Sequence, residues 1–266
     1  MSNTQIISVI NQKGGVGKTT TVINLATALT FQKKKVLVID LDPQGNATTG
    51  LGLSNKGSSK TIYEVLNGNC EFEEAIQDTK IKNLKIVSSN VDLSGLEVET
   101  ASENRRAFLL KDKIENYINR QKNDFSYIFI DCPPSLSLLT IMALVVAKSL
   151  IVPLQAEFFA LEGVSQLIKT IDRIKINLNP ELSIRGVLLT MFDKRNKLSS
   201  EVESEARKFF QSKVYKTVIP RNVRLSEAPS HGTPVLIYDK LCTGSKSYSS
   251  FAEEFLKQEE IMESAA

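Results

Sequence analysis

Residues 6–20 read IISVINQKGGVGKTT, and this stretch decides the fold. Its first five residues are mostly apolar and predict a buried strand, and residues 18–32 predict a helix. Between them, glycines at positions 14, 15 and 17 let successive backbone N–H groups turn inward, and the helix N-terminus adds a partial positive charge. The stretch therefore predicts a phosphate-binding loop, in which Lys18 reaches the phosphates and the Thr19 hydroxyl binds Mg²⁺.

The loop departs from the usual pattern G-x-x-x-x-G-K-[ST] at its first position. Gln12 stands where that pattern has glycine, and Lys13 adds a second lysine inside the loop. The alternative is a glycine-rich turn that contains Gly-Lys-Thr by chance, which the preceding strand and the following helix disfavour. The residues predicted to bind the nucleotide here are Lys13, Gly14, Gly15, Val16, Gly17, Lys18, Thr19 and Thr20.

Apolar runs alternate with helical patterns along the rest of the chain. The runs expected to form strands are Ile6–Ile10, Val36–Leu41, Leu84–Ser88, Tyr127–Asp131, Ser149–Pro153, Ile184–Thr190 and Tyr215–Ile219. The segments expected to form helices are 18–32, 103–121, 136–147, 157–177, 199–211 and 247–261. Because the strands are apolar on both faces, we expect an α/β fold: a doubly wound, mostly parallel sheet flanked by helices. Residues 53–60 (LSNKGSSK) indicate a polar loop rather than a linker, so the 266 residues are expected to form a single domain.

Acidic residues stand at the ends of two predicted strands. Asp40 and Asp42 follow one apolar run, and Asp131 ends another. A buried carboxylate needs a cation or hydrogen-bond donors nearby, and ligands bind at the carboxyl ends of such strands. We predict that Asp131 holds the Mg²⁺ of Mg²⁺–ATP through a water, that Asp40 lies near the metal, and that Asp42 positions the attacking water. The alternative for each is a turn or helix N-cap aspartate.

The bulk composition indicates a soluble, cytoplasmic protein. No apolar run reaches the roughly 18 residues of a membrane helix, and residues 136–147 come closest. The first residues lack the pattern of a signal peptide. Cys70, Cys132 and Cys242 form no C-x-x-C pair and are expected to be reduced thiols, and the single histidine, His231, is expected to be structural.

Four motifs together resemble the ParA/Soj chromosome-partitioning ATPases, from about residue 4 to 256. The loop 13–19 is similar to the deviant Walker A motif, and the other three motifs are DLDPQGNAT (40–48), DCPPS (131–135) and IPRNVRLSEAPSHG (219–232). The resemblance implies an ATP-dependent sandwich homodimer in which Lys13 reaches the phosphates held by the other subunit, much as an arginine finger does. It also implies that Pro220 and Asn222 line the adenine pocket. A ParB-type centromere-binding partner that stimulates hydrolysis is implied as well.

Positive charge concentrates in residues 194–224. This segment has nine Lys and Arg against three Glu, a net charge of +6, whereas the whole chain carries only +3. Clustered lysine and arginine suffice for non-specific binding to double-stranded DNA, although a solvated basic face is the alternative. The resemblance implies that Arg195 and Arg224 contact the DNA and that the protein associates with the nucleoid.

Two other functions compete with DNA partition. A MinD-like regulator acting at the membrane is disfavoured by the acidic C-terminal stretch FAEEFLKQEEIME (251–263), since membrane-binding amphipathic helices are basic on their polar face. A metabolic enzyme of the same superfamily is the third possibility. The cysteine spacing disfavours an iron–sulfur reductase of that kind.

Overall fold

The apolar runs form one seven-stranded sheet in the computed structural model, which describes residues 4–54, 60–120, 124–157 and 160–264. Six strands are parallel, and the short edge strand β3 is antiparallel to β4. The expected doubly wound, mostly parallel sheet is therefore confirmed. The strands are β1 (Gln5–Val9), β2 (Val36–Asp40), β3 (Ile76–Asp78), β4 (Leu84–Val87), β5 (Tyr127–Asp131), β6 (Ser149–Gln155) and β7 (Ser183–Thr190).

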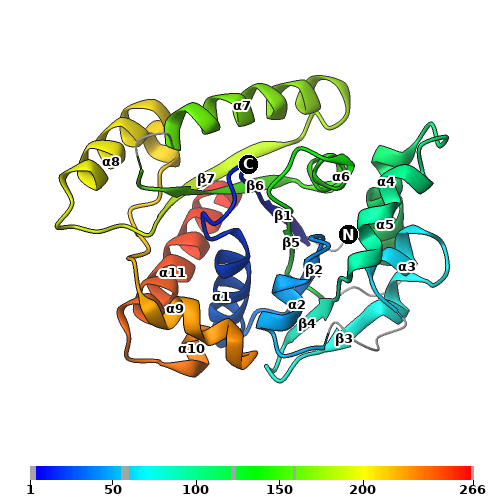
Figure 1. Cartoon of the computed structure of the whole chain (residues 1–266), viewed down its shortest axis with the longest axis horizontal. Helices are drawn as coiled ribbons and strands as arrows, with labels where there is room; N and C mark the ends of the chain where they lie inside the picture. The colour runs from blue at the N-terminus through cyan, green and yellow to red at the C-terminus, as the bar shows by residue number, and fades with distance from the viewer. Residues whose placement is uncertain (1–3, 55–59, 121–123, 158–159, 265–266) are drawn as a thin grey trace.

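Helices cover both faces of this sheet (Figure 1). They are α1 (Lys18–Phe31), α2 (Asn46–Gly50), α3 (Ile62–Leu66), α4 (Leu96–Glu99), α5 (Leu109–Arg120), α6 (Leu138–Val146), α7 (Ala160–Asn177), α8 (Lys197–Phe210), α9 (Val223–Glu227), α10 (Val235–Tyr238) and α11 (Thr243–Ser264). Among the described residues, no helix is both long enough and apolar enough to cross a membrane.

The two faces of the sheet have separate hydrophobic cores. Val36 and Val38 of β2 point to the face where α1 and α11 pack, while Leu37 and Ile39 point to the face covered by α5 and α6. The helices α7 and α8 cover that second face farther along, over β6 and β7. This alternation explains why both faces of the central strands are apolar.

The strand order brings the acidic strand ends together. It runs β3-β4-β2-β5-β1-β6-β7, so β5 lies between β2 and β1. In the register of the sheet, Asp131 lies beside Asp40 on one side and beside Val9 on the other. The phosphate loop, which follows β1, and the two acidic strand ends therefore meet at one edge of the sheet, as the sequence predicted.

One expected strand, Tyr215–Ile219, is wrong. This segment runs beside β7, where the amides of Tyr215 and Ile219 donate to the carbonyls of Val187 and Leu189 at 3.0 and 2.8 Å. Only two isolated bridges form, Val187 with Val214 and Phe192 with Pro220, and both lie just outside the segment. Between these points the ladder is interrupted, and the backbone amides of Lys216 and Thr217 donate to the Glu254 carboxylate at 2.6 and 2.8 Å.

Smaller differences affect the other expected elements. The edge strand β3 was not expected, because it has only three residues and none of them is buried. The helix expected at 103–121 is shorter and begins at Leu109, after a 3₁₀ turn (Arg106–Phe108). The last helix, expected at 247–261, is longer and begins at Thr243. Five residues of the polar loop 53–60, namely 55–59, lie outside the described residues, as do residue 121 of one expected helix and residues 158–159 of another.

Candidate functional site

The phosphate loop has the backbone geometry that its glycines predicted. Gly15 and Gly17 adopt positive φ angles of 73° and 89°, which other residues rarely adopt. Gly17 is the N-cap of α1, and its carbonyl accepts the first hydrogen bond of the helix from the Thr21 amide at 2.9 Å. The free amides at the start of α1 therefore face the loop, where they can bind an anion.

A cavity of about 610 Å³ opens at this loop. Its walls come from the loop, the turn after β2, the turn after β5, the end of β7 and the segment before α10. The lining residues are Gly14, Gly15, Gly17, Lys18, Thr19, Thr20, Ile23, Asp42, Gln44, Asn46, Thr49, Pro134, Met191, Pro229 and Ser230. All predicted nucleotide-loop residues except Lys13 and Val16 thus line one cavity together with Asp42.

Lys18 lies inside this cavity and is 6% exposed. Its Nζ donates to the backbone carbonyl of Lys13 at 3.3 Å, so the side chain folds back over the loop. Burial lowers the pKa of Lys18, and the nearby carboxylates Asp131 and Asp42 act in the opposite direction. A buried ammonium group poised over backbone N–H groups is well placed to hold phosphate oxygens.

The second loop lysine points elsewhere. The Nζ of Lys13 forms an ion pair with the Glu157 carboxylate at 2.8 Å, and both side chains are nearly half exposed. Lys13 does not line the phosphate cavity. The two lysines of the loop, five residues apart, therefore face different surroundings.

Asp131 ends β5 and is fully buried. Neither of its carboxylate oxygens has a hydrogen-bond partner among the described residues. Burial, followed by the charge of Asp40, raises its pKa well above the usual value, and Thr19 and Lys18 act in the opposite direction. A buried carboxyl group without partners beside a threonine hydroxyl fits a divalent cation, because hard cations take oxygen ligands. The described residues contain no cluster of three His, Cys, Asp or Glu, so the remaining ligands would be phosphate oxygens and waters.

Asp40, although also buried, has donors around it. Its Oδ2 accepts hydrogen bonds from the Thr48 amide at 2.8 Å and the Thr48 hydroxyl at 2.7 Å, and its Oδ1 accepts one from the Asp42 amide at 3.2 Å. Burial raises the pKa of Asp40 to about 6, against the effect of these hydrogen bonds. Its hydrogen bonds to Thr48 hold the end of β2 against α2. Its role near the metal stays a prediction.

Asp42 reaches the cavity that Asp40 does not line. It is 6% exposed, and its Oδ1 accepts a hydrogen bond from the Gln44 amide at 3.0 Å. This bond orients the carboxylate at the turn after β2. A carboxylate held in this way, on the wall of a phosphate cavity, can polarise a water molecule.

The residues predicted to bind adenine lie outside this cavity. Pro220 lines a second cavity of about 560 Å³, whose other walls include Phe192, Arg195 and Arg221. Consecutive residues after β7 line the two cavities, Met191 the first and Phe192 the second. The complete lining of the second cavity is Phe192, Asp193, Lys194, Arg195, Val218, Pro220, Arg221, Thr243 and Ser247.

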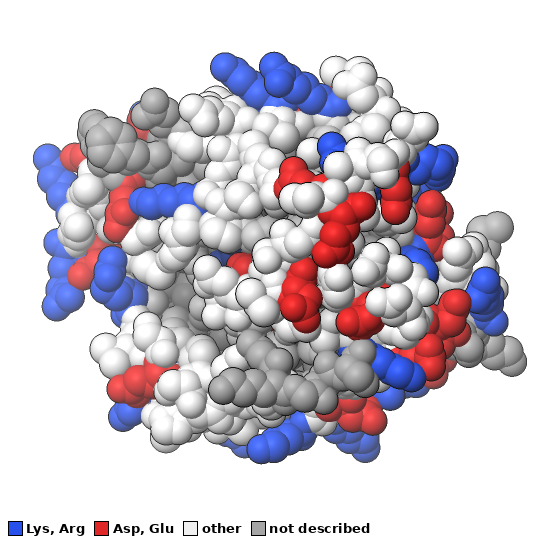
Figure 2. All heavy atoms as spheres, turned by 45° about the vertical axis from the view of Figure 1, so that its right-hand side comes forward, with Lys and Arg blue, Asp and Glu red and all other residues white. Residues whose placement is uncertain are grey.

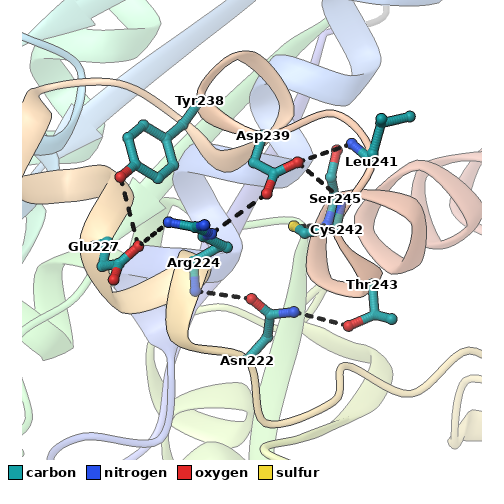
Figure 3. Close-up of polar contacts among 9 residues, drawn as sticks. All are labelled: Asn222, Arg224, Glu227, Tyr238, Asp239, Leu241, Cys242, Thr243 and Ser245. Carbon is teal, nitrogen blue, oxygen red and sulfur yellow. Dashed lines mark hydrogen bonds and ion pairs between the residues drawn. The ribbon is translucent and has the colours of Figure 1, made fainter.

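Asn222 has structural contacts that the sequence did not predict. Its Oδ1 caps α9 by accepting from the Arg224 amide at 2.8 Å, and its Nδ2 donates to the Thr243 hydroxyl at 2.8 Å (Figure 3). These contacts hold the start of α9 beside the start of α11. Its contact with adenine stays a prediction.

The sequence reasoning missed Pro229 and Ser230, which line the phosphate cavity from the far end of the chain. They belong to a 3₁₀ turn (Ala228–His231) that is held close to α2. A Cβ atom added to Gly232 would lie 2.8 Å from the Cα of Gly52, so both positions need the small residue. The only signal was that both residues fall within the motif 219–232.

Comparison with known proteins places this site in a family. A family model described as AAA domain matches residues 4–184. The chromosome partitioning protein ParA of Caulobacter vibrioides (strain NA1000 / CB15N) is 49% identical, over 96% of this chain and 95% of that protein. The sporulation initiation inhibitor protein Soj of Bacillus subtilis (strain 168) is 46% identical, over 94% of this chain and 97% of that protein.

A solved structure supports the same placement. The crystal structure of cobyrinic acid a,c-diamide synthase from Mycobacterium smegmatis with bound ADP and magnesium superimposes with a TM-score of 0.84, at 34% identity. The match covers 97% of this chain and 96% of that one. The fold, the phosphate cavity and near-full-length identity of more than 45% together show that the chain belongs to the ParA/Soj family of P-loop ATPases.

Proposed function

We propose that this protein is a DNA-partition ATPase, whose ATP-bound dimer binds double-stranded DNA non-specifically and leaves it after hydrolysis. The observation that carries the proposal is the cavity of about 610 Å³, in which the phosphate loop faces Asp42. The loop amides and Lys18 would hold the phosphates of ATP, and Asp42 would orient the attacking water. Thr19 and Asp131 would hold Mg²⁺, which neutralises charge on the phosphates when bound.

The exposed position of Lys13 supports a dimer. Its ammonium group lies outside its own cavity and is paired with Glu157 on the surface. A lysine supplied by a second subunit would add positive charge to the phosphates only when two ATP-bound subunits meet. The ion pair with Glu157 is exposed, so breaking it costs little free energy.

Lys13→Ala is expected to bind ATP with nearly normal affinity and to remain monomeric, because Lys18 already serves the phosphates within each subunit. Light scattering with ATP measures the dimer, and calorimetry measures ATP affinity. Glu157→Gln is the matched control: it removes the same ion pair but keeps the lysine, and should dimerise normally. A stable ATP-bound dimer of Lys13→Ala would refute the role across the subunit interface.

DNA binding is proposed for the side of the molecule formed by α8 and α9. The side that carries α4 and α5 is less suited to DNA, because a band of acidic side chains crosses it (Figure 2). Exposed acidic residues there include Asp92, Glu97, Glu99 and Glu103. Such a face repels phosphates, whereas the segment 194–224 carries the excess of lysine and arginine.

The double change Arg195→Ala with Arg224→Ala is expected to abolish DNA association at physiological salt while sparing ATP binding and dimerisation. Each phosphate contact adds about 0.9 to the slope of log K against log salt, so Arg224→Ala alone should lower this slope by up to about 2 in a dimer. Fluorescence anisotropy on two unrelated duplexes measures both effects. Arg105→Ala with Arg120→Ala, which removes two other exposed arginines, is the control.

Two outcomes would contradict this assignment. An unchanged salt slope in the Arg195/Arg224 double variant would place the DNA surface elsewhere. Loss of ATP binding in that variant would show that the arginines serve the nucleotide instead.

The partner that stimulates hydrolysis is proposed to be a ParB-type centromere-binding protein, by analogy with the family. A metabolic ligase is the second candidate, because the similar diamide synthase structure is 34% identical. The higher identity of 49% to a partition protein favours partition. ATP-dependent retention on arbitrary duplex DNA, with no retention on liposomes, would support partition against both the ligase and a MinD-like membrane regulator.

A further inference from the structure

Both arginines proposed to contact DNA are already bound to carboxylates of their own chain. Arg195 is 91% exposed, yet its Nε and Nη2 donate to Oδ1 and Oδ2 of Asp193, at 3.0 and 2.9 Å. This is a bidentate pair. The hydrogen bonds from Arg195 lower the pKa of Asp193 to about 2, so the carboxylate stays ionised at any physiological pH.

Arg224 is held by two carboxylates instead of one. Its Nη1 donates to Oε2 of Glu227 at 2.8 Å, and its Nε lies 3.4 Å from Oδ2 of Asp239 (Figure 3). The Tyr238 hydroxyl approaches the same Glu227 oxygen at 3.5 Å. Figure 3 shows the guanidinium between the two acids, which come from α9 and from the residue after α10.

These contacts engage part of the five N–H donors of each guanidinium group. A guanidinium binds phosphate best through two parallel N–H groups, in the same geometry that it uses for a carboxylate. Asp193 accepts from Nε and Nη2, which form one edge of the Arg195 guanidinium. At Arg224, Glu227 pairs with Nη1 and Asp239 with Nε. Each guanidinium has five N–H donors, so a phosphate can still bind beside these carboxylates, but their negative charge repels it.

The local charge is also less positive than the sequence suggests. The net charge of +6 in residues 194–224 omits Asp193, Glu227 and Asp239, which lie outside this segment in the chain. Arg195 with Asp193 is neutral, and Arg224 with its two acids carries −1. The positive charge of the two arginines is thus neutralised by neighbouring carboxylates in the conformation described.

We propose that Asp193, Glu227 and Asp239 form a carboxylate clamp that competes with DNA phosphates for the two arginines and lowers the DNA affinity of the protein. The proposal rests on the proposed DNA-binding function of these arginines. The clamp is reversible, since exposed ion pairs are individually weak. It provides a reason why the protein can leave DNA readily: each arginine that releases a phosphate regains a partner within its own chain.

Two of the three clamp acids, Asp193 and Asp239, also accept hydrogen bonds from backbone amides. Asp239 Oδ1 accepts hydrogen bonds from the amides of Leu241 and Cys242, both at 3.1 Å, ahead of α11. Asp193 Oδ1 accepts one from the amide of Arg195 at 3.0 Å. These bonds do not involve the guanidinium groups, so they favour the same positions of both acids when an arginine side chain moves away. An ion pair formed only between two flexible surface side chains has no such backbone hydrogen bonds.

The test neutralises the clamp without removing these backbone contacts. Glu227→Gln with Asp239→Asn keeps the size of both side chains, and Asn retains the Oδ1 that accepts from the amides ahead of α11. Asp193→Asn does the same at the other arginine. Releasing one arginine from an exposed ion pair is expected to raise DNA affinity about twofold to fivefold, and a dimer presents each arginine twice. DNA affinity of the ATP-loaded protein is therefore expected to rise about 4-fold to 25-fold for each clamped arginine.

A charge-matched control separates the clamp from a general effect of net charge. Asp124→Asn with Glu74→Gln also removes two exposed carboxylates, which pair with Lys35 and Lys60 away from the arginines. This control should bind DNA like the wild type. Adding Arg224→Ala to the Glu227/Asp239 variant should remove the gain, because no arginine is left to release. ATP affinity is measured in every variant to establish that the fold is intact.

The possible results give distinct answers. No gain in the clamp variants, or an equal gain in the control, or a gain that survives Arg224→Ala, would overturn the clamp. If Arg195→Ala with Arg224→Ala binds DNA like the wild type, the proposed DNA surface itself is wrong. A gain in the clamp variants that depends on the arginines supports both.

Discussion

Lys18→Ala is expected to lower ATP affinity by about 100-fold or more, the largest effect that we expect on nucleotide binding. The Lys18 ammonium is buried in the phosphate cavity, where charge-assisted hydrogen bonds are strong. Two such bonds to phosphate oxygens contribute about 3–6 kcal/mol, which corresponds to a factor of about 10² to 10⁴. Isothermal calorimetry with ATP and Mg²⁺ measures the loss directly.

Dimerisation and DNA binding should disappear in the same variant, because each depends on bound ATP in the proposed cycle. Lys13→Ala serves as the matched control from the same loop, since it removes an equal charge and should still bind ATP. Circular dichroism establishes that the variant is folded. Normal ATP affinity in Lys18→Ala would contradict the assignment of the phosphate loop.

Asp42→Asn is expected to reduce ATP turnover by about 10² to 10⁴, the usual range for losing a catalytic base. The change keeps an Oδ1 that can accept from the Gln44 amide, so the turn after β2 should be preserved. ATP binding should remain within about threefold of the wild type, because Lys18 and the loop amides hold the phosphates. Single-turnover assays with radiolabelled ATP separate binding from hydrolysis.

The Asp42 variants should therefore accumulate as long-lived ATP dimers on DNA. Asp42→Ala, which also loses the hydrogen bond to Gln44, should behave in the same way if the carboxylate charge is what matters. Size-exclusion chromatography with ATP, followed over hours, reports the lifetime of the dimer. Turnover close to that of the wild type would show that Asp42 is only a turn residue.

Much of the site was predictable because it is encoded locally. The glycines of residues 13–19 determine the backbone of the phosphate loop within a few positions, and Gly15 and Gly17 indeed have positive φ angles. Asp42 and Asp131 could be placed at one edge because the carboxyl ends of parallel strands meet there. The resemblance added the roles of Lys13, Pro220 and Asn222, which no local pattern predicts.

Other features depend on contacts between distant parts of the chain. Residues 215–219 have the composition of a strand, but the Glu254 carboxylate of α11 takes two of their backbone amides. Pro229 and Ser230 reach the phosphate cavity because Gly232 packs against Gly52. No periodicity in the sequence reports such pairings.

The α/β fold, the phosphate loop and the strand-end acids could be predicted from the chain alone, because apolar periodicity and glycine conformation act over a few neighbouring residues. The tertiary structure alone decided which charges meet. It turns Lys13 out toward Glu157, and it leaves the buried oxygens of Asp131 without partners among the described residues. It also sets Asp239 against Arg224. The physical reason is that an ion pair depends on distance in space, which the chain reaches only after its helices have packed.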